Sequence, residues 1–353
     1  MLYVGLDVHA RQSTFCVLDL NGRHLRTHAI RGRWDKVLAE LAAMKRPFAV
    51  CFEATSGYGY LHEQLRKMAK RVVVAHPGQL RLIFRSRRKS DRVDAGKLAK
   101  LLFLDEVPPV YVPSAHVRAW RGMIEFRTKL VGERTRVKNR IRALLRTAGI
   151  VPPRGLWTKR GLAWLAGQTM GTDFDLVRRD VLIDELKSLD AKIKRVQKVL
   201  GAVGGQHPGV HLLMTIPGVG PRTAEAVVAY IDKPERFTRN KAVGSYFGLV
   251  PSQDASAEQN RLGHITRQGP GTVRRLLVEA AWQGIWRSEQ IRTFFERIRQ
   301  GNPERKKIAI VATAHYLLRA MHSMLLSGEA WQGPARERIV AGPSRPVVLE
   351  SSR

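Results

Sequence analysis

The sequence predicts an α/β domain built on a mixed sheet, followed by a mainly helical region. Three strand-like runs at the N-terminus precede an alternation of helical and strand-like segments, an order that indicates a mixed sheet with helices packed on it. From Ser114 onward, apolar residues recur at helical spacing over long stretches. We therefore expect the sheet to form the first domain and helices to form most of the rest.

The elements of the first domain follow from local composition. Strands are expected at residues 2–8, 13–19, 23–30, 48–53 and 71–75, with Asn21-Gly22 as a hairpin turn. Helices are expected at residues 34–44 and 58–69, and a further helix begins at Asp91. This is the order of the ribonuclease H-like fold, in which the first and fourth strands lie side by side. The domain is expected to cover residues 1–107, ending before Pro108-Pro109.

Four carboxylates occupy structured positions in this domain. Asp7 and Glu53 lie near the ends of the first and fourth strands, so adjacent strands would bring them together at one end of the sheet. Asp91 and Asp94 share one face of the first turn of a helix, where like charges repel unless a cation lies between them. The helix N-terminus offsets part of that repulsion. Each acid alone is more simply a strand end or a helix cap, but the set indicates a metal site.

The composition favours a polyanionic partner. The chain of 353 residues carries 61 Lys and Arg against 30 Asp and Glu, a net charge of +31; nucleic acid is the default partner and an anionic membrane surface the rival. No apolar run approaches the roughly 20 residues of a spanning helix, and no signal-peptide pattern precedes Asp7. We expect a cytoplasmic, nucleoid-associated protein. Cys16 and Cys51 are interpreted as buried apolar residues in a reducing compartment.

A basic segment follows the fifth strand, between Gln79 and Arg92. It is either a loop that contacts phosphates or a solvated linker. The residues assigned to nucleic-acid binding in it are Arg85, Arg87, Arg88 and Lys89.

Two long helices are expected in residues 114–200. The first covers about residues 114–149 and the second about residues 175–200, each with apolar residues at helical or heptad spacing. The apolar stripes are Leu130, Val137, Ile141, Leu144 and Leu145 in the first helix, and Val181, Leu182, Leu186, Leu189, Ile193 and Val196 in the second. The pair forms a coiled-coil hairpin, an oligomerisation arm, or a helical insert packed within its own chain. A glycine-rich hinge is expected at residues 201–209.

Residues 210–330 are expected to form a mainly helical domain. The stretch from Leu212 to Ala224 has the pattern of a helix-hairpin-helix, in which Gly218 and Gly220 would expose backbone N–H groups to a phosphate, with Arg222 beside them. Alternatively, the glycines serve only the geometry of a tight turn. Residues 252–260 are expected to form a polar loop before a short strand at residues 261–266. Helices follow after Gly271, at about residues 288–299 and 303–327, and residues 333–353 form a flexible tail.

Six short motifs occur in order along the chain. They are Val4-Gly5-Leu6-Asp7-Val8-His9, Glu53-Ala54-Thr55-Ser56-Gly57, Asp91-Arg92-Val93-Asp94-Ala95, Ile216-Pro217-Gly218-Val219-Gly220-Pro221, Gly248-Leu249-Val250-Pro251 and Arg261-Leu262-Gly263-His264-Ile265-Thr266. With these motifs, most of the chain resembles the DEDD transposases of insertion sequences, the IS110 family. Any one motif alone would be weak, but their occurrence together and in order is specific.

The resemblance implies a RuvC-like nuclease domain, a coiled-coil linker and a C-terminal transposase domain. It implies that Asp7, Glu53, Asp91 and Asp94 hold Mg²⁺, an ion that hard oxygen ligands suit. It also implies a serine nucleophile that leaves DNA joined to the protein as a phosphoserine, double-stranded donor and target DNA, and a structured bridge RNA as guide. Relatives act as tetramers with composite sites, so a homo-oligomer, dimer to tetramer, is expected.

The candidate nucleophile falls where the chain departs from the family pattern. Many relatives carry paired serines followed by Gly-Gly-Lys, whereas this chain has Asp254-Ala255-Ser256-Ala257-Glu258-Gln259. Counting back from Arg261, which we assign to nucleic-acid binding, places Ser256 on the second serine. Ser252 is the alternative.

The sequence therefore predicts a transposase that cuts and rejoins DNA through Ser256, with Mg²⁺ at the four acids. A second hypothesis is a RuvC-like Holliday-junction resolvase that hydrolyses DNA with water and needs no serine. A third is a non-catalytic basic protein that binds DNA or RNA, with structural acids. A covalent protein–DNA adduct distinguishes the first hypothesis from the second, and an effect of magnesium on DNA integrity excludes the third.

Overall fold

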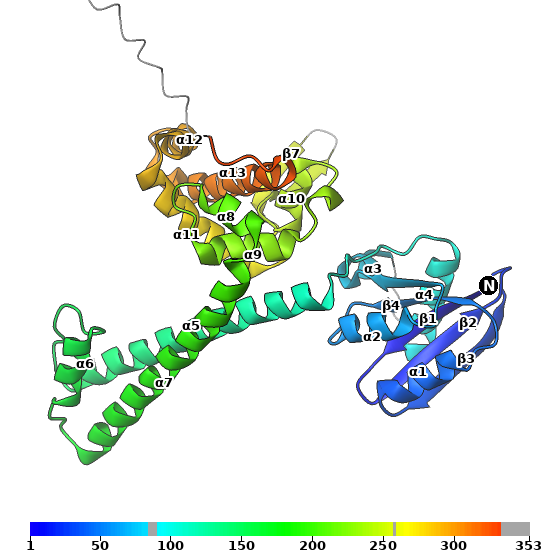
Figure 1. Ribbon diagram of the computed structural model, residues 1–353, viewed down its shortest axis with the longest axis horizontal. Helices are drawn as coiled ribbons and strands as arrows, with labels where there is room; N and C mark the ends of the chain where they lie inside the picture. Colours follow the sequence, from blue (N-terminus) through cyan, green and yellow to red (C-terminus); the bar gives the residue numbers. More distant parts are fainter. Residues whose placement is uncertain (84–89, 257–258, 333–353) are drawn as a thin grey trace, which may run out of the picture. The chain divides into compact units, whose positions relative to one another are not determined.

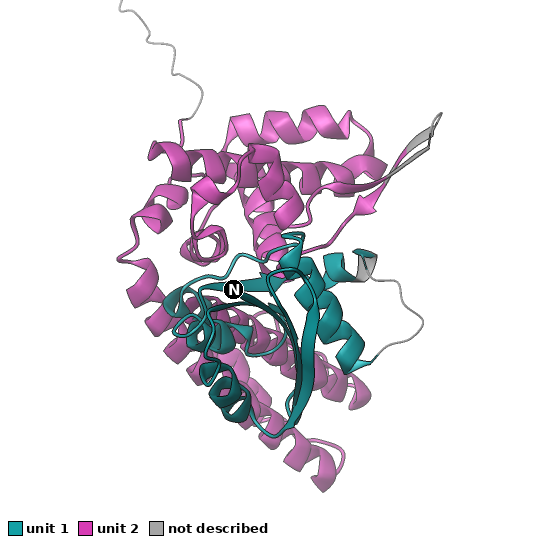
Figure 2. Cartoon of the chain, turned by 90° about the vertical axis from the view of Figure 1, so that its right-hand side faces the viewer, with its two compact units in different colours: residues 1–118 teal, residues 119–353 magenta. Residues whose placement is uncertain are grey.

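The computed structural model describes residues 1–83, 90–256 and 259–332. The chain divides into two compact units, Met1–Arg118 and Ala119–Arg353 (Figure 2). Arg85, Arg87, Arg88 and Lys89, together with the predicted tail at residues 333–353, lie outside the described residues. The four-part division predicted from the sequence is finer than these two units and stays a prediction.

Unit 1 contains a five-stranded mixed sheet (Figure 1). Its strands are β1 (Leu2–Val8), β2 (Gln12–Leu18), β3 (His24–Arg31), β4 (Phe48–Glu53) and β5 (Arg71–Ala75), in the order β3-β2-β1-β4-β5. β1 pairs antiparallel with β2 and parallel with β4. The first and fourth strands are therefore neighbours, as the sequence predicted.

Helices cover both faces of this sheet. On one face, α1 (Trp34–Ala42) and α2 (Tyr58–Leu65) bury Leu41 and Leu61 in one core with Val4 and Phe52. On the other face, α4 (Asp91–Phe103) packs against the intervening strand residues, including the buried free Cys51. The two faces follow the strand alternation, since successive residues of a strand point to opposite sides. A short helix, α3 (Pro77–Ile83), occupies the start of the basic segment, where the sequence pattern indicated only a loop or linker.

Gly5 sets the distance between α4 and the sheet. A Cβ at Gly5 would overlap the backbone oxygen of Ala95 and the backbone nitrogen of Ala99. Helix α4 can lie this close to β1 because glycine leaves room for its backbone. The first turn of α4 is thereby brought to the end of β1.

The chain stays attached to the sheet beyond residue 107. His76 N donates to Pro108 O at 2.8 Å, Val110 N donates to Val74 O at 2.7 Å, and Ala75 forms an isolated bridge with Pro109. The two prolines suggested a domain boundary because proline cannot donate a backbone hydrogen bond. Their carbonyl oxygens can still accept, and here the segment satisfies the open edge of β5.

Two long antiparallel helices follow, the first crossing from unit 1 into unit 2 at Arg118 (Figure 1). They are α5 (Ala115–Thr147) and α7 (Asp173–Gly204), with α6 (Lys159–Ala166) between them in the chain. Arg134 Nη1 lies 3.1 Å from Asp190 Oδ1, and Arg140 Nη1 lies 3.6 Å from Glu185 Oε2, so the partners run in opposite directions along the two helices. Both long helices were predicted; the coiled-coil assignment stays a prediction.

The buried stripe of α7 differs from the predicted one at its start. Val181 is 60% exposed, and the stripe begins instead with Arg179 and Ile183. The helical period of 3.6 residues places these two on the same face as Leu186, whereas position 181 points away. The predicted stripe of α5 is buried in full.

The predicted hinge at residues 201–209 is largely helical. Helix α7 continues to Gly204, where a Cβ would overlap the side chain of Glu225. This glycine therefore allows two helices to approach closely, a packing role that composition alone could not separate from flexibility.

The remaining elements of unit 2 share one core with the long helices. They are α8 (Pro208–Met214), α9 (Pro221–Ile231), η1 (Pro234–Arg236), α10 (Asn240–Tyr246), α11 (Gly271–Arg287), α12 (Glu289–Arg299), η2 (Pro303–Arg305) and α13 (Lys306–Ser327). Among the described residues, one helical stretch, Pro303–Ser327, is long and apolar enough by length and composition to cross a membrane, and half of its apolar window is buried inside the protein. That burial is typical of a core helix.

A two-stranded antiparallel ribbon replaces most of the predicted polar loop. β6 (Pro251–Ser256) pairs with β7 (Gln259–Ile265), so residues 251–256 are a strand and not a loop. The polarity of this segment indicated a loop, but pairing with β7 satisfies the backbone of a strand whatever its side chains.

Candidate active site

Asp7, His9 and Asp91 converge at the end of β1. His9 Nε2 lies 3.2 Å from Asp7 Oδ2 and 3.9 Å from Asp91 Oδ1. One possible ligand atom from each of the three residues lies within 4.8 Å of the other two. Asp7 is two residues beyond Gly5, on the sheet face that α4 covers. The acidic cluster, as we call Asp7, His9, Asp91 and the adjacent Asp94, could therefore hold a metal ion.

The first turn of α4 supplies Asp91 and Asp94. Ser90 is the N-cap in an extended conformation, and its Oγ accepts a hydrogen bond from Val93 N at 3.4 Å. This cap fixes where the helix begins, and it leaves both acids at the positive end of the helix dipole. Gln12 Nε2 also donates to Asp91 Oδ2 at 3.3 Å, while Asp94 Oδ1 lies 3.7 Å from Lys97 Nζ.

The pKa of Asp7 reflects this arrangement. Burial raises it above its ordinary value, His9 lowers it, and the negative charges of Asp91 and Asp94 raise it further. Asp7 is therefore partly desolvated and feels the negative charges of Asp91 and Asp94, and a bound cation would relieve that repulsion. Clustered carboxylate oxygens of this kind fit a hard divalent ion.

Glu53 occupies the neighbouring strand at the level of Asp7. Leu6 is in register with Phe52 across parallel strands, so Asp7 and Glu53 follow at the same level and on the same face. Among the described residues, however, the group with closely spaced ligand atoms contains Asp7, His9 and Asp91 but not Glu53. The structure therefore brings two of the four predicted acids, Asp7 and Asp91, together with His9. Asp94 is near enough to act on the charge of Asp7, and Glu53 lies on the neighbouring strand.

His9 is a member of the cluster that the sequence analysis did not assign. The signal that could have found it is its spacing, since a residue two positions after Asp7 returns to the same side of an extended chain. Trp34 Nε1 donates to the backbone oxygen of His9 at 3.3 Å, which ties α1 to this segment. An imidazole nitrogen beside carboxylates is a softer donor than the oxygens around it.

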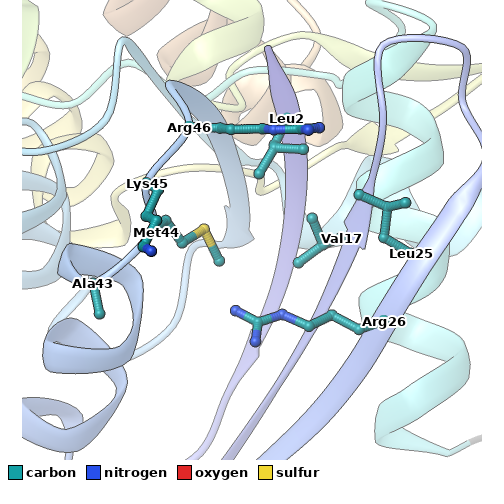
Figure 3. Close-up of a pocket in the computed structure, with 8 residues that line it drawn as sticks. All are labelled: Leu2, Val17, Leu25, Arg26, Ala43, Met44, Lys45 and Arg46. Atoms are coloured by element: carbon teal, nitrogen blue, oxygen red, sulfur yellow. The ribbon is translucent and has the colours of Figure 1, made fainter.

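A separate groove lies at the opposite end of the strands (Figure 3). It is lined by Leu2, Val17, Leu25, Arg26, Ala43, Met44, Lys45 and Arg46. Leu2 is the first residue of β1 and Asp7 is next to the last, so the groove is distinct from the acidic cluster. The cluster carries the carboxylates and is the candidate active site.

The two candidate serines lie on β6 of unit 2. Ser252 Oγ donates to His264 O at 3.1 Å, across the ribbon. Ser256 is the last residue of β6, and its register partner is Gln259 on β7. Ser252 is thus part of the hydrogen bonding of the ribbon, whereas Ser256 lies at the end where the two strands connect.

The predicted phosphate-binding turn joins α8 and α9. Gly218 has a φ of 93°, and a Cβ there would overlap the backbone of Gly284 in α11, so this glycine serves close packing. Gly220 is the exposed N-cap of α9. Arg222 Nη2 lies 2.8 Å from Glu225 Oε1, and Arg261 is exposed on β7. Close packing of the turn accounts for Gly218. The helix-hairpin-helix and the assignment of these residues to nucleic-acid binding stay predictions.

Two family models match different parts of the chain. A DEDD model of the IS110 type, described as a transposase, matches residues 4–150. A model described as "Transposase IS116/IS110/IS902 family" matches residues 210–296. The first match contains the whole acidic cluster, and the second contains the β6–β7 ribbon.

Curated relatives agree with these matches. The chain is 28% identical over 291 residues to a probable family 20 transposase of Pseudomonas aeruginosa, with 79% of this chain and 82% of that protein covered. It is 26% identical over 283 residues to the transposase for insertion sequence element IS1111A of Coxiella burnetii, covering 79% and 76%. It is 24% identical over 279 residues to the transposase for insertion sequence element IS1328 of Yersinia enterocolitica, covering 79% and 82%. The two models together match residues 4–150 and 210–296, and on these matches the chain belongs to the IS110 family of insertion-sequence transposases.

Proposed function

We propose that this transposase cuts and rejoins DNA through a covalent phosphoserine on Ser256, with Mg²⁺ held by Asp7, Glu53, Asp91 and Asp94. The observation that carries the proposal is the convergence of Asp7, His9 and Asp91 at the end of β1 in a chain whose family acts on DNA. The raised pKa of Asp7 supports a cation at this place, since a proton or a metal ion relieves the same repulsion. A hard divalent ion bound there would neutralise charge on the scissile phosphate.

The proposed chemistry consists of two transesterifications. In the first, a bond forms between Ser256 Oγ and the scissile phosphorus, and the bond from phosphorus to a deoxyribose oxygen breaks. The serine loses its proton, and the departing deoxyribose oxygen takes one up. In the second, a deoxyribose hydroxyl attacks the phosphoserine and restores the serine hydroxyl, so each phosphodiester bond broken is replaced.

The ribbon supports Ser256 over Ser252 as the nucleophile. Ser252 already donates its hydroxyl proton to His264 O within the ribbon. Ser256 lies at the connecting end of the two strands, the part of a hairpin that can approach another molecule. Because the Ser252 hydroxyl already takes part in the ribbon, we favour Ser256 as the nucleophile.

We also propose a structured guide RNA and a homo-oligomer of two to four copies as partners. The net charge of +31 is suited to two polyanions bound at the same time, since phosphate neutralisation supplies much of nucleic-acid affinity. Arg261, on the same ribbon as Ser256, is proposed to contact a phosphate near the scissile bond.

The decisive experiment searches for the covalent intermediate. The purified protein is incubated with RNA transcribed from the flanks of its element, labelled donor DNA and Mg²⁺, and then denatured. We expect DNA attached to a peptide that contains Ser256, as mapped by mass spectrometry. We also expect chelation of the metal or Asp7→Asn to prevent its formation.

Two variants serve as matched controls for the nucleophile. Ser256→Ala should form no adduct, whereas Ser252→Ala should still form one. An adduct that persists in Ser256→Ala and disappears in Ser252→Ala would move the nucleophile to Ser252. DNA cut without any adduct would indicate hydrolysis by water, as in a resolvase.

A further inference from the structure

Trp34 and Tyr60 form a stacked aromatic pair, which we call the aromatic platform. Their ring centroids are 6.3 Å apart and their planes differ by 22°. Tyr60 is 52% exposed and Trp34 is half-buried. Trp34 begins α1 and Tyr60 lies in the first turn of α2, so two helices contribute one ring each.

Two contacts hold the indole of Trp34 by its edges. Its Nε1 donates to the backbone oxygen of His9 at 3.3 Å. Its opposite edge lies against Gly57, where a Cβ would overlap the indole carbons. Gly57 has a φ of 78°, a conformation that glycine adopts readily, so the backbone here both turns into α2 and leaves room for the ring.

The aromatic platform contacts His9, a member of the acidic cluster. His9 accepts the hydrogen bond of Trp34 through its backbone and lies 3.2 Å from Asp7 through its ring. Gly57, on the other side of the indole, lies four residues after Glu53 in the chain. The segments that follow β1 and β4 therefore contact the platform and adjoin two of the acids, Asp7 and Glu53.

Positively charged side chains lie near the aromatic platform in the chain. Arg11 and Arg33 are exposed, and they adjoin the segments that carry His9 and Trp34. Gly32 N donates to Arg11 O at 2.9 Å, which holds those two segments together. Exposed guanidinium groups beside a rigid aromatic surface are the combination by which proteins bind single-stranded nucleic acid.

We propose that Trp34 and Tyr60 stack an unpaired nucleobase of the DNA strand whose phosphate lies at the acidic cluster. The inference deepens the proposed function and rests on it, because it assumes that the cluster receives the scissile phosphate. A strand that is cut and passed between partners unpairs during the exchange, and unstacking its bases is unfavourable. Stacking of a base on an aromatic side chain offsets that cost.

The test measures binding without cleavage, in the full-length protein carrying Asp7→Asn. The probes are a DNA duplex with unpaired bases that include 2-aminopurine, the same duplex fully paired, and an RNA counterpart with the same unpaired bases. We expect Tyr60→Ala to weaken binding of the DNA with unpaired bases about five- to tenfold and to reduce quenching of 2-aminopurine. Affinity for the paired duplex should stay within about twofold.

Three variants control for the fold and for the chemistry of the ring. Tyr60→Phe keeps a ring and should bind like the parent. Leu104→Ala removes an exposed apolar side chain at the far end of α4 and should also leave binding unchanged. Trp34→Phe keeps the ring but loses the bond to His9, and it should weaken binding less than Trp34→Ala, with thermal melting used to confirm folding.

Equal loss of affinity for paired and unpaired DNA in Tyr60→Ala would overturn the proposal, as would unchanged quenching. An effect confined to the RNA probe would overturn the assignment to the DNA strand. The binding test uses the inactive Asp7→Asn protein and the adduct test uses the parent protein, so the two proposals can fail separately. Loss of stacking in Tyr60→Ala, together with no phosphoserine adduct at Ser256 in the parent, would disprove the proposed cleavage chemistry while leaving the platform established.

Discussion

At the scale of single residues, the candidate site depends on the absence of a side chain at Gly5 as well as on the side chains that form the site. Gly5 leaves space for the backbone of α4 at Ala95 and Ala99, and α4 in turn carries Asp91 to Asp7. The capping hydroxyl of Ser90 fixes where that helix begins. The acids thus meet because of neighbours that take no part in the chemistry.

Replacing Gly5 with alanine should separate the acids. The new methyl group would overlap backbone atoms that cannot rotate away, so α4 must shift, at a cost of about 1–3 kcal/mol of stability. We expect a lower melting temperature and weaker binding of Mn²⁺, used as a spectroscopic substitute for Mg²⁺, in a titration. The matched control is Gly96→Ala in the same helix, where the new Cβ would meet no described atom within 4 Å apart from its chain neighbours and the backbone of its own helix. That variant should be neutral or more stable, by up to about 1 kcal/mol; equal metal affinity in both variants would contradict the argument.

Glu225 provides a test by pH at the same scale. Its side chain is 2% exposed and lies 2.8 Å from Arg222, and its Oε2 has no hydrogen-bond partner among the described residues. Burial raises its pKa from 4.5 to about 7, while the charges of Arg222 and Arg127 lower it. The folded protein therefore binds more protons than the unfolded chain between these two values, and the stability of unit 2 should fall as pH rises through that range.

Glu225→Gln should abolish this pH dependence because an amide does not titrate. Burial lowers the pKa values of His207 and His315, which adds a change of the opposite sign, so the parent is compared with the variant at each pH. We expect the parent to lose on the order of 1–3 kcal/mol relative to Glu225→Gln between about pH 5 and about pH 8, measured as the shift of the thermal transition. Glu279→Gln, at an exposed position of α11, is the control and should keep the dependence of the parent. A parent that gains stability relative to Glu225→Gln over this range would show that the ion pair with Arg222 outweighs burial.

At the scale of elements, the sequence pattern of the long helices predicted both helices correctly but misplaced the start of the buried face of α7. Both helices form, and the α5 stripe is buried as predicted, but the α7 stripe starts at Arg179 and Ile183. Leu182 is half-buried and Val181 exposed, since apolar residues in succession do not by themselves define a face. The partner helix determines which of them is covered.

Replacing a buried and an exposed apolar residue of α7 with alanine should change stability by different amounts. Leu186→Ala, at 1% exposure, should destabilise unit 2 by about 2–5 kcal/mol because it opens a cavity in the core. Val181→Ala removes a smaller exposed side chain and should change stability by no more than about 0.5 kcal/mol. Chemical denaturation of the two variants measures the difference. A comparable loss in Val181→Ala would place that residue in a contact, such as one between copies of the chain.

At the scale of the whole molecule, the acids and the candidate serine belong to different compact units, Met1–Arg118 and Ala119–Arg353. The family resemblance implies sites composed of parts from two protomers. Proteins defective in different parts should then complement each other within one oligomer.

We expect Asp7→Asn and Ser256→Ala proteins each to be inactive in excision and their mixture to regain part of the activity. The measurement is excision of the element from a labelled donor, with each variant alone as the reference. Binding of donor DNA should be retained in both, because neither substitution removes a positive charge. A mixture as inactive as its components would show that the two residues act within one protomer or that one of them is dispensable.

Much of unit 1 could be predicted from the sequence because its information is local. Period-two apolar runs, one hairpin turn and two helical patterns determine the strand order, and parallel register then places Glu53 beside Asp7. The ribbon at β6 could not be predicted, since a polar strand is stabilised by its partner. His9 was not assigned from the sequence, because its spacing places it beside Asp7 but does not show that Asp91 of a distant helix joins them.

The sequence by itself determined the family motifs, the positive charge and the sheet that carries Asp7, because these follow from composition and from periodicity along the chain. The tertiary structure decided which acids meet, which glycines serve packing and which apolar residues are buried. The sequence does not distinguish Gly5 from Gly204, yet Gly5 leaves room for a helix beside the candidate active site and Gly204 leaves room for Glu225. Such distinctions depend on contacts between distant segments, whose distances are fixed only when the chain has folded.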